Sequence, residues 1–167
     1  MNRSNRSRTP LRNLRTYGSS RAVRLPDCDY IGDIDIHVTM CANRDKPFTD
    51  DVVAAMICEN VEFYCRNLAY RLYGYCLMPD HLHVLLSPAE SDKPMSHWLD
   101  VFKSYTTHCW MKSSHRAPLW QPSANDHVCR TGETAETVLA YIVNNPVRAG
   151  LVDCWQDWRW TKVFIEV

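Results

Sequence analysis

Long apolar runs are absent from this sequence of 167 residues. No stretch approaches the roughly 18 apolar residues that a membrane-spanning helix requires. The first 29 residues also lack the apolar segment of a secretory signal. The length suits one domain with a sizeable hydrophobic core. We therefore expect a soluble, cytoplasmic, single-domain protein.

Paired cysteine motifs are missing too, although the chain contains eight cysteines. None belongs to a Cys-x-x-Cys pair, and several stand singly in apolar segments such as residues 54–58. Isolated cysteines of this kind are typical of reduced, buried side chains in a cytoplasmic protein. The pattern argues against both a disulfide framework and a structural zinc site.

Acidic residues are absent before residue 25, where seven arginines occur. From residue 25 onward the chain holds 12 of its 19 basic residues and all 19 acidic ones, a formal charge of −7. We expect residues 1–29 to be a basic, disordered arm and residues 30–167 to be the folded domain. A basic arm on an acidic body is typical of proteins that touch nucleic acid through a tail. The alternative is a segment with no role.

Hydrophobic periodicity divides the remaining chain into strands and helices. We expect strands at residues 34–40, 71–78, 81–87 and 127–130, helices at 52–70, 95–111 and 133–145, and a final strand at 161–165. Pro146 should end the third helix, because the residue before a proline is pushed out of the α region. The order β-α-β-β-α-β with an extra C-terminal helix predicts a ferredoxin-like (RRM-like) α+β sandwich. Its central antiparallel sheet would carry helices on one face, with the first and third strands as neighbours.

Two histidines, His81 and His83, lie two residues apart in one of these predicted strands. Side chains at i and i+2 of a strand point to the same face, so the two imidazoles would lie side by side. Leu82 and Val84 would then face the core. Two neutral imidazoles aimed at one point form most of a minimal divalent-metal site. The alternative is a half-buried polar face that binds nothing.

A tyrosine and an amide occupy one face of the third predicted helix. Tyr141 and Asn145 are four residues apart, so both could reach the pocket that holds the histidines. The alternative for Tyr141 is an ordinary side chain of an amphipathic helix. Tyr105 is the rival tyrosine, but its helical neighbours Phe102 and Cys109 suggest that it belongs to the core.

Five segments of the chain carry a family resemblance. They are Gly74-Tyr75-Cys76-Leu77-Met78-Pro79-Asp80-His81-Leu82-His83, Phe102-Lys103-Ser104-Tyr105-Thr106, Leu119-Trp120-Gln121-Pro122, Asp126-His127-Val128-Cys129-Arg130 and Tyr141-Ile142-Val143-Asn144-Asn145-Pro146-Val147-Arg148-Ala149-Gly150-Leu151-Val152. In this order they resemble the HUH single-tyrosine transposases, most closely the REP-associated tyrosine transposases. The resemblance covers roughly residues 34–160. At residues 122–125 the chain departs from it, because relatives usually have basic and aromatic residues there.

The resemblance implies a catalytic domain over residues 30–167 that cleaves and rejoins single-stranded or hairpin DNA. His81 and His83 would hold a divalent cation, Asn145 would complete or support the metal site, and Tyr141 would be the nucleophile. The reaction would pass through a 5′-phosphotyrosine and leave a free 3′-hydroxyl, so it would need no ATP. Two imidazoles, one amide and open positions suit Mg²⁺ or Mn²⁺ better than zinc.

Three basic residues are candidates for contacts with DNA phosphates: Arg148, Lys103 and Arg130. For Arg148 a surface salt bridge is an equally good interpretation. Near the end of the chain Trp155, Trp158 and Trp160 lie close together. They could stack on unpaired bases, but such spacing near a chain end favours a hydrophobic lid.

Two other functions remain open at this point. The domain could be a non-catalytic binding module for structured single-stranded nucleic acid. It could also be a metal-dependent hydrolase, although the sequence places no Glu or Asp as its general base. The protein could act as a monomer or as a homodimer, and the short link between the strands and the tyrosine helix favours a monomer that acts in cis.

Overall fold

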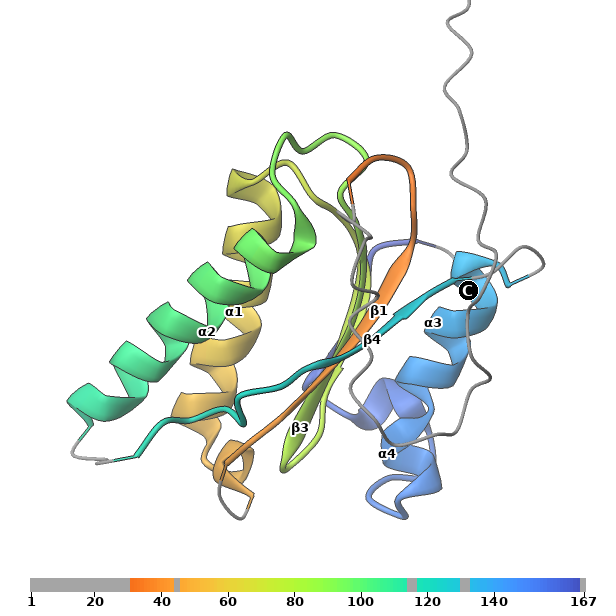
Figure 1. Cartoon of the computed structure of the whole chain (residues 1–167). Helices are drawn as coiled ribbons and strands as arrows, with labels where there is room; N and C mark the ends of the chain where they lie inside the picture. Colours follow the sequence, from red (N-terminus) through yellow and green to blue (C-terminus); the bar gives the residue numbers. More distant parts are fainter. Residues whose placement is uncertain (1–30, 44–45, 114–116, 130–132, 166–167) are drawn as a thin grey trace, which may run out of the picture.

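The computed structural model describes residues 31–43, 46–113, 117–129 and 133–165, and it contains one antiparallel sheet with helices on both faces (Figure 1). The predicted basic arm and Arg130 lie outside these residues. The strands are β1 (Ile36–Cys41), β2 (Arg71–Leu77), β3 (His81–Ser87), β4 (Asn125–Val128) and β5 (Thr161–Val163). The helices are α1 (Asp51–Asn67), α2 (Met95–Lys112), α3 (Ala135–Val143) and α4 (Asn145–Arg148), with short 3₁₀ turns η1 (Pro47–Thr49) and η2 (Trp155–Asp157).

The strands follow the order β4-β1-β3-β2-β5, and every pairing is antiparallel. The chain order β-α-β-β-α-β and the neighbouring positions of β1 and β3 confirm the predicted ferredoxin-like α+β fold. β3 lies at the centre of the sheet, so its side chains are held by a strand on either side. Such a strand is a rigid platform for a functional site.

One face of the sheet is apolar over β1 and β3 and is covered by α1 and α2 (Figure 1). Val38 of β1 and Val84 of β3 are opposite each other in the register, and both are fully buried. Asp50 begins α1, because its carboxylate accepts hydrogen bonds from the backbone of Val52 and Val53. Most of the hydrophobic core lies in this layer.

The opposite face is covered by α3 and α4 (Figure 1), and its character changes from strand to strand. Over β2 it is apolar, since Cys76 packs with Leu139 and Ile142 of α3 in a second buried cluster. Gly74 permits this close packing, because a Cβ there would lie 2.7 Å from Leu139 Cδ1 and 2.8 Å from the Lys162 carbonyl oxygen. Over β1 and β3 the same face carries polar side chains.

The prediction that Pro146 ends the third helix is wrong in one respect. α3 ends at Val143, but after Asn144 the chain makes another helical turn, α4, with Pro146 in its first turn. Proline is tolerated there because the first N–H groups of a helix have no partner within the helix. The extra turn carries Arg148 back toward α3.

The ends of the sheet differ slightly from expectation. The fourth strand is Asn125–Val128 rather than residues 127–130, and the final strand β5 ends at Val163 rather than residue 165 and pairs with β2. Trp155 and Trp158 pack against the cluster under α3, and Trp158 Nε1 donates to the Leu77 carbonyl at 2.9 Å. This packing confirms the hydrophobic-lid interpretation for these two tryptophans. None of the helices in the described ranges is long and apolar enough to cross a membrane.

Candidate active site

His81 and His83 project from β3 on the face that α3 covers. Leu82 and Val84 between and beside them belong to the opposite, apolar core, so the predicted alternation is confirmed. The centroids of the two imidazole rings are 4.8 Å apart, and the ring planes are nearly perpendicular at 88°. The strand therefore holds two imidazoles side by side at the centre of the sheet.

Each of these histidines uses its Nδ1 atom in a local contact. His81 Nδ1 lies 2.6 Å from a carboxylate oxygen of Asp80, and His83 Nδ1 lies 3.0 Å from Thr39 Oγ1. In both rings Nε2 is the remaining ligand atom. A histidine whose second nitrogen is held by a carboxylate or another polar group is the usual form of a metal ligand in proteins. The donor chemistry of this pair therefore fits a divalent cation.

Sequence reasoning missed the contribution of β1 to this site. His37 and Thr39 project from β1 to the same face as the histidine pair, and Thr39 is opposite His83 in the register. His37 Nε2 lies 3.0 Å from His83 Nδ1, and both rings are buried. The signal was available, because a predicted strand next to the histidine strand alternates apolar residues with His37 and Thr39.

His83 is held in its neutral form. Its pKa lies well below the usual value for histidine, mainly because burial disfavours the charged ring. The neighbouring His37, His81 and Arg148 lower the pKa further by electrostatic repulsion. A neutral imidazole offers a lone pair at neutral pH, as a metal ligand must.

Tyr141 projects from α3 toward the same polar face. Its ring centroid lies 6.4 Å from that of His37, in an edge-to-face arrangement, and the side chain is half-buried. Arg148 of α4 lies over the Tyr141 ring, with its guanidinium carbon 4.7 Å from the ring centroid. Because Arg148 also affects the pKa of His83, the phenol, the guanidinium and the imidazoles form one cluster.

Asn145 lies one turn beyond Tyr141, as predicted, at the start of α4. Its amide nitrogen donates to the carbonyl oxygens of Tyr141 and Ile142, at 3.2 Å and 3.0 Å. The carboxamide nitrogen is therefore turned back onto α3, and the carboxamide oxygen is the atom left to bind a ligand. Among the described residues, no group of three or more His, Cys, Asp or Glu side chains is placed to hold a metal ion.

Lys103 is separated from this cluster by the sheet. It belongs to α2, on the other face of the sheet, and its ammonium donates to the carbonyl oxygens of Gln121 and Pro122 at 2.6 Å and 3.2 Å. The structure gives Lys103 a part in anchoring the loop before β4. Its contact with DNA stays a prediction that the geometry does not support.

Tyr105 also lies on α2 and cannot reach the histidines across the sheet. The prediction that it is a core residue is wrong, because its side chain is 46% exposed and contacts Tyr64. Its neighbours Phe102 and Thr106 are the buried residues of this part of α2. Of these two tyrosines, only Tyr141 faces the histidine pair.

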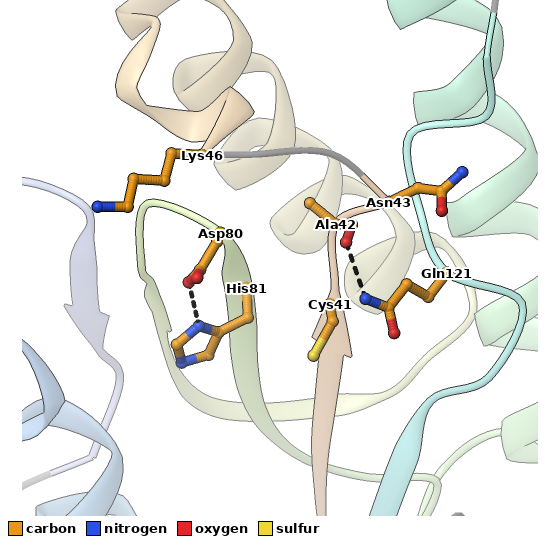
Figure 2. Close-up of a pocket in the computed structure, with 7 residues that line it drawn as sticks. All are labelled: Cys41, Ala42, Asn43, Lys46, Asp80, His81 and Gln121. Atoms are coloured by element: carbon orange, nitrogen blue, oxygen red, sulfur yellow. Dashed lines mark hydrogen bonds and ion pairs between the residues drawn. The ribbon is translucent and has the colours of Figure 1, made fainter.

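A hollow of about 330 Å³ opens beside His81 (Figure 2). Lys46, Asp80 and His81 lie on one side of it, and Asn43 and Gln121 lie on the other (Figure 2). A hydrogen bond of 3.1 Å from the Gln121 amide to the Ala42 carbonyl fixes the far wall. The hollow thus offers one ammonium group and two carboxamides next to the exposed side of the histidine pair.

Fold and site together define the class: an antiparallel α+β sandwich with two histidines on its central strand and a helix-borne tyrosine over the same face. A family model described as "Transposase IS200 like" matches residues 30–145, well over half of the chain, and the chain belongs to this family. The matched range contains His81, His83, Tyr141 and Asn145.

Two curated relatives are similar to this chain. A "REP-associated tyrosine transposase" of Escherichia coli (strain K12) is 28% identical over 103 residues, which are 61% of this chain and 59% of the relative. A protein of Haemophilus influenzae, named for the same REP-associated group, is 25% identical over 113 residues, 62% of this chain and 64% of the relative. The matches therefore span less than two thirds of each relative.

A solved structure has the same fold. It is the structure of a REP-associated tyrosine transposase bound to a REP hairpin, and it superposes with a TM-score of 0.65 at 22% identity. The match covers 89% of this chain and 81% of the other. At this identity the likeness establishes the architecture.

Proposed function

We propose that this protein is a tyrosine transposase that cleaves and rejoins single-stranded DNA, with Tyr141 as its nucleophile. The observation that carries the proposal is the position of Tyr141 on the histidine face of its own sheet, 6.4 Å between ring centroids from His37. Both groups come from one chain. We therefore propose that the active site is assembled in cis, within one chain, and that the protein can act as a monomer.

The chemistry would be a phosphodiester exchange. The Tyr141 oxygen forms a bond to the backbone phosphorus, the bond from phosphorus to the 3′ oxygen breaks, and the departing oxygen becomes a 3′-hydroxyl. The phenol loses its proton and the leaving oxygen gains one. The phosphotyrosine keeps the energy of the broken bond, so a 3′-hydroxyl can later reverse the exchange without ATP.

Arg148 would supply positive charge where the reaction needs it. Its guanidinium lies over the Tyr141 ring, and it can turn to pair with a phosphate oxygen because the residue is exposed at the surface. A cation beside the phosphorus stabilises the charge that develops on the equatorial oxygens.

His81 and His83 would hold a divalent cation through their Nε2 atoms, and Asn145 through its carboxamide oxygen. Bound there, Mg²⁺ or Mn²⁺ would act as a Lewis acid on the scissile phosphate. The contacts at the two Nδ1 atoms keep the rings oriented for that role.

Hairpin DNA is the proposed substrate. A relative's structure is named for its complex with a REP hairpin, and the curated relatives carry the REP-associated description. The hollow beside His81 would receive the single strand next to the hairpin, with Lys46 near a phosphate (Figure 2). Its carboxamides could form hydrogen bonds to base edges.

The test is formation of a covalent adduct with a hairpin-containing DNA oligonucleotide in Mn²⁺. We expect wild-type protein to give a denaturant-resistant protein–DNA species and an equal amount of free 3′-hydroxyl product. Tyr141→Phe should abolish the adduct, because the ring remains but the nucleophilic oxygen is gone. Tyr105→Phe, at an exposed tyrosine on the other side of the sheet, is the matched control and should leave the yield unchanged.

Three results would contradict the proposal. Binding of the hairpin without any adduct would identify a nucleic-acid binding module. Nicking that survives Tyr141→Phe would identify a hydrolase in which water attacks the phosphate. An adduct lost in Tyr105→Phe and kept in Tyr141→Phe would show that Tyr105, and not Tyr141, is the nucleophile.

A further inference from the structure

Three hydrogen-bonded side chains lie on the sheet near Tyr141. His37 Nε2 and Thr39 Oγ1 are each 3.0 Å from His83 Nδ1, and the two are 3.4 Å from each other. The imidazoles of His37 and His83 are 5% and 7% exposed, so bulk water does not compete for these bonds. One nitrogen of His83 is thus surrounded by two polar groups of β1.

An N···N contact between imidazoles is a hydrogen bond only if one nitrogen carries the proton and the other the lone pair. In one arrangement His83 donates from Nδ1, and its Nε2 keeps a lone pair. In the other His37 donates from Nε2, and the proton of His83 moves to Nε2, where a cation can no longer bind. The β1 partners therefore decide whether His83 can be a ligand.

Thr39 favours the first arrangement. With a proton on His83 Nδ1, one N–H is shared between two acceptors that each lie 3.0 Å away, His37 Nε2 and Thr39 Oγ1. In the second arrangement two donors would converge on a single in-plane lone pair of His83, which accepts best from one.

We propose that His37, together with Thr39, is a positioning residue that holds His83 as the Nδ1–H tautomer and so keeps Nε2 of His83 open as a cation ligand. The inference deepens the proposed function and rests on it for its consequence in DNA cleavage. The tautomer and the binding of the cation can be measured without DNA.

The first test is the tautomer of His83 in the wild-type protein without metal. In a ¹⁵N–¹H spectrum that correlates ring nitrogens with ring protons, we expect His83 to carry its proton on Nδ1. Loss of its signals in His83→Gln makes the assignment. A wild-type spectrum in which Nε2 of His83 carries the proton would overturn the proposal.

The second test is the affinity for Mn²⁺ alone, measured by electron paramagnetic resonance of the free ion. His37→Phe keeps a ring but removes the acceptor, and it should weaken binding by about 10- to 100-fold, the usual effect of losing such a partner. His37→Gln can place an oxygen where Nε2 lies and should restore most of the affinity. His108→Phe, at an exposed histidine of α2, is the matched control and should bind as the wild type does.

Folding of each variant is checked by circular dichroism, so that a loss of affinity is read only from folded protein. Folded His37→Phe with wild-type affinity would overturn the proposal, as would His37→Gln as weak as His37→Phe. Binding of Mn²⁺ that depends on His37, without any DNA adduct in the wild type, would support this inference and contradict the proposed function. Adduct formation that is unchanged in His37→Phe would support the proposed function and contradict this inference.

Discussion

The two histidines of β3 have different surroundings, although they are two residues apart. His81 is partly exposed and has the Asp80 carboxylate at its Nδ1, whereas His83 is buried between strands with His37 and Thr39 at its Nδ1. Burial keeps His83 neutral. The Asp80 carboxylate thus orients one ring through its Nδ1, and packing between strands holds the other ring in place.

Cysteine reactivity should follow burial rather than position in the sequence. Burial raises the pKa of Cys58 and Cys65 to about 12, so at pH 8 both remain thiols, and thiols react slowly with iodoacetamide. Cys154 is exposed. In the folded protein we expect mass spectrometry to find Cys154 alkylated first, with Cys58 and Cys65 protected.

Denaturant is the control for this experiment, because all three cysteines should react at similar rates in the unfolded chain. Protection should also hold at pH 9, since that is still well below about 12. Cys65 labelled as fast as Cys154 in the folded protein would contradict the buried position given to it here.

At the residue scale the sequence predicted the histidine pair well, because a strand's two-residue period fixes which side chains share a face. The alternation of β1 also placed His37 and Thr39 on one face, but the register that brings His37 to His83 depends on pairing across the whole sheet. The sequence could not predict that Lys103 anchors a loop, because charge alone does not separate a phosphate contact from a carbonyl contact. Its judgement of Tyr105 failed because the buried face of α2 runs through Phe102 and Thr106, whereas Tyr105 is 46% exposed.

At the scale of elements, the contact between α3 and β2 places the tyrosine over the histidines. The helix approaches the strand closely at Gly74, where a Cβ would meet Leu139 Cδ1 at 2.7 Å and the Lys162 carbonyl oxygen at 2.8 Å. Leu139 lies two residues before Tyr141 on the same helix. A shift of α3 at this point would therefore move the phenol.

Gly74→Ala should lower both stability and activity. The added methyl group must push the helix or the edge strand β5 away, and overpacking of this kind costs about 1–3 kcal/mol of the free energy of unfolding. The yield of DNA adduct should fall even when the protein is folded, because Tyr141 moves with α3. Urea unfolding and the adduct assay measure the two effects.

Val52→Ala is the control for that prediction, since Val52 is 79% exposed on α1 and its truncation should change stability by less than about 0.5 kcal/mol. If Gly74→Ala had the stability and the adduct yield of the wild type, the contact at Gly74 would not be what holds α3 in place.

Most elements were predictable from periodicity, and the remaining errors have local causes. α4 was missed because Pro146 is unfavourable inside a helix but acceptable in its first turn. The fourth strand was displaced because β4 is an edge strand of four residues, and its position follows from pairing with β1 rather than from its own apolar pattern.

At the scale of the whole molecule, the basic charge of the N-terminal segment contrasts with the net acidic charge of the rest of the chain. Residues 1–24 contain seven arginines and no acidic residue, whereas the rest of the chain carries a formal −7. A protein that binds DNA through such a body needs local cations, such as Arg148 and Lys46, and gains from a basic segment outside it.

Removal of residues 1–29 should weaken DNA binding and make it less sensitive to salt. Each phosphate neutralised on a single strand contributes about 0.7 to the slope of log affinity against log salt concentration. We expect the truncated protein to show a shallower slope and lower affinity at low salt, measured by fluorescence anisotropy with the hairpin oligonucleotide.

The matched control for truncation is the full-length chain with its seven N-terminal arginines changed to glutamine, which keeps the length and removes the charge. It should behave as the truncated protein does. An unchanged salt dependence in both would mean that this segment has no part in binding DNA.

The most direct measurement of the central claim is the mass of the peptide that carries the DNA. Trypsin should release residues 131–148, which contain Tyr141 as their single tyrosine. After reaction with the hairpin oligonucleotide and nuclease digestion, we predict a 5′-phosphorylated nucleotide on Tyr141 by tandem mass spectrometry. A modified residue in any other peptide, or cleaved DNA with no modified peptide, would contradict the claim that Tyr141, which α3 brings to the histidine face of the sheet, is the nucleophile.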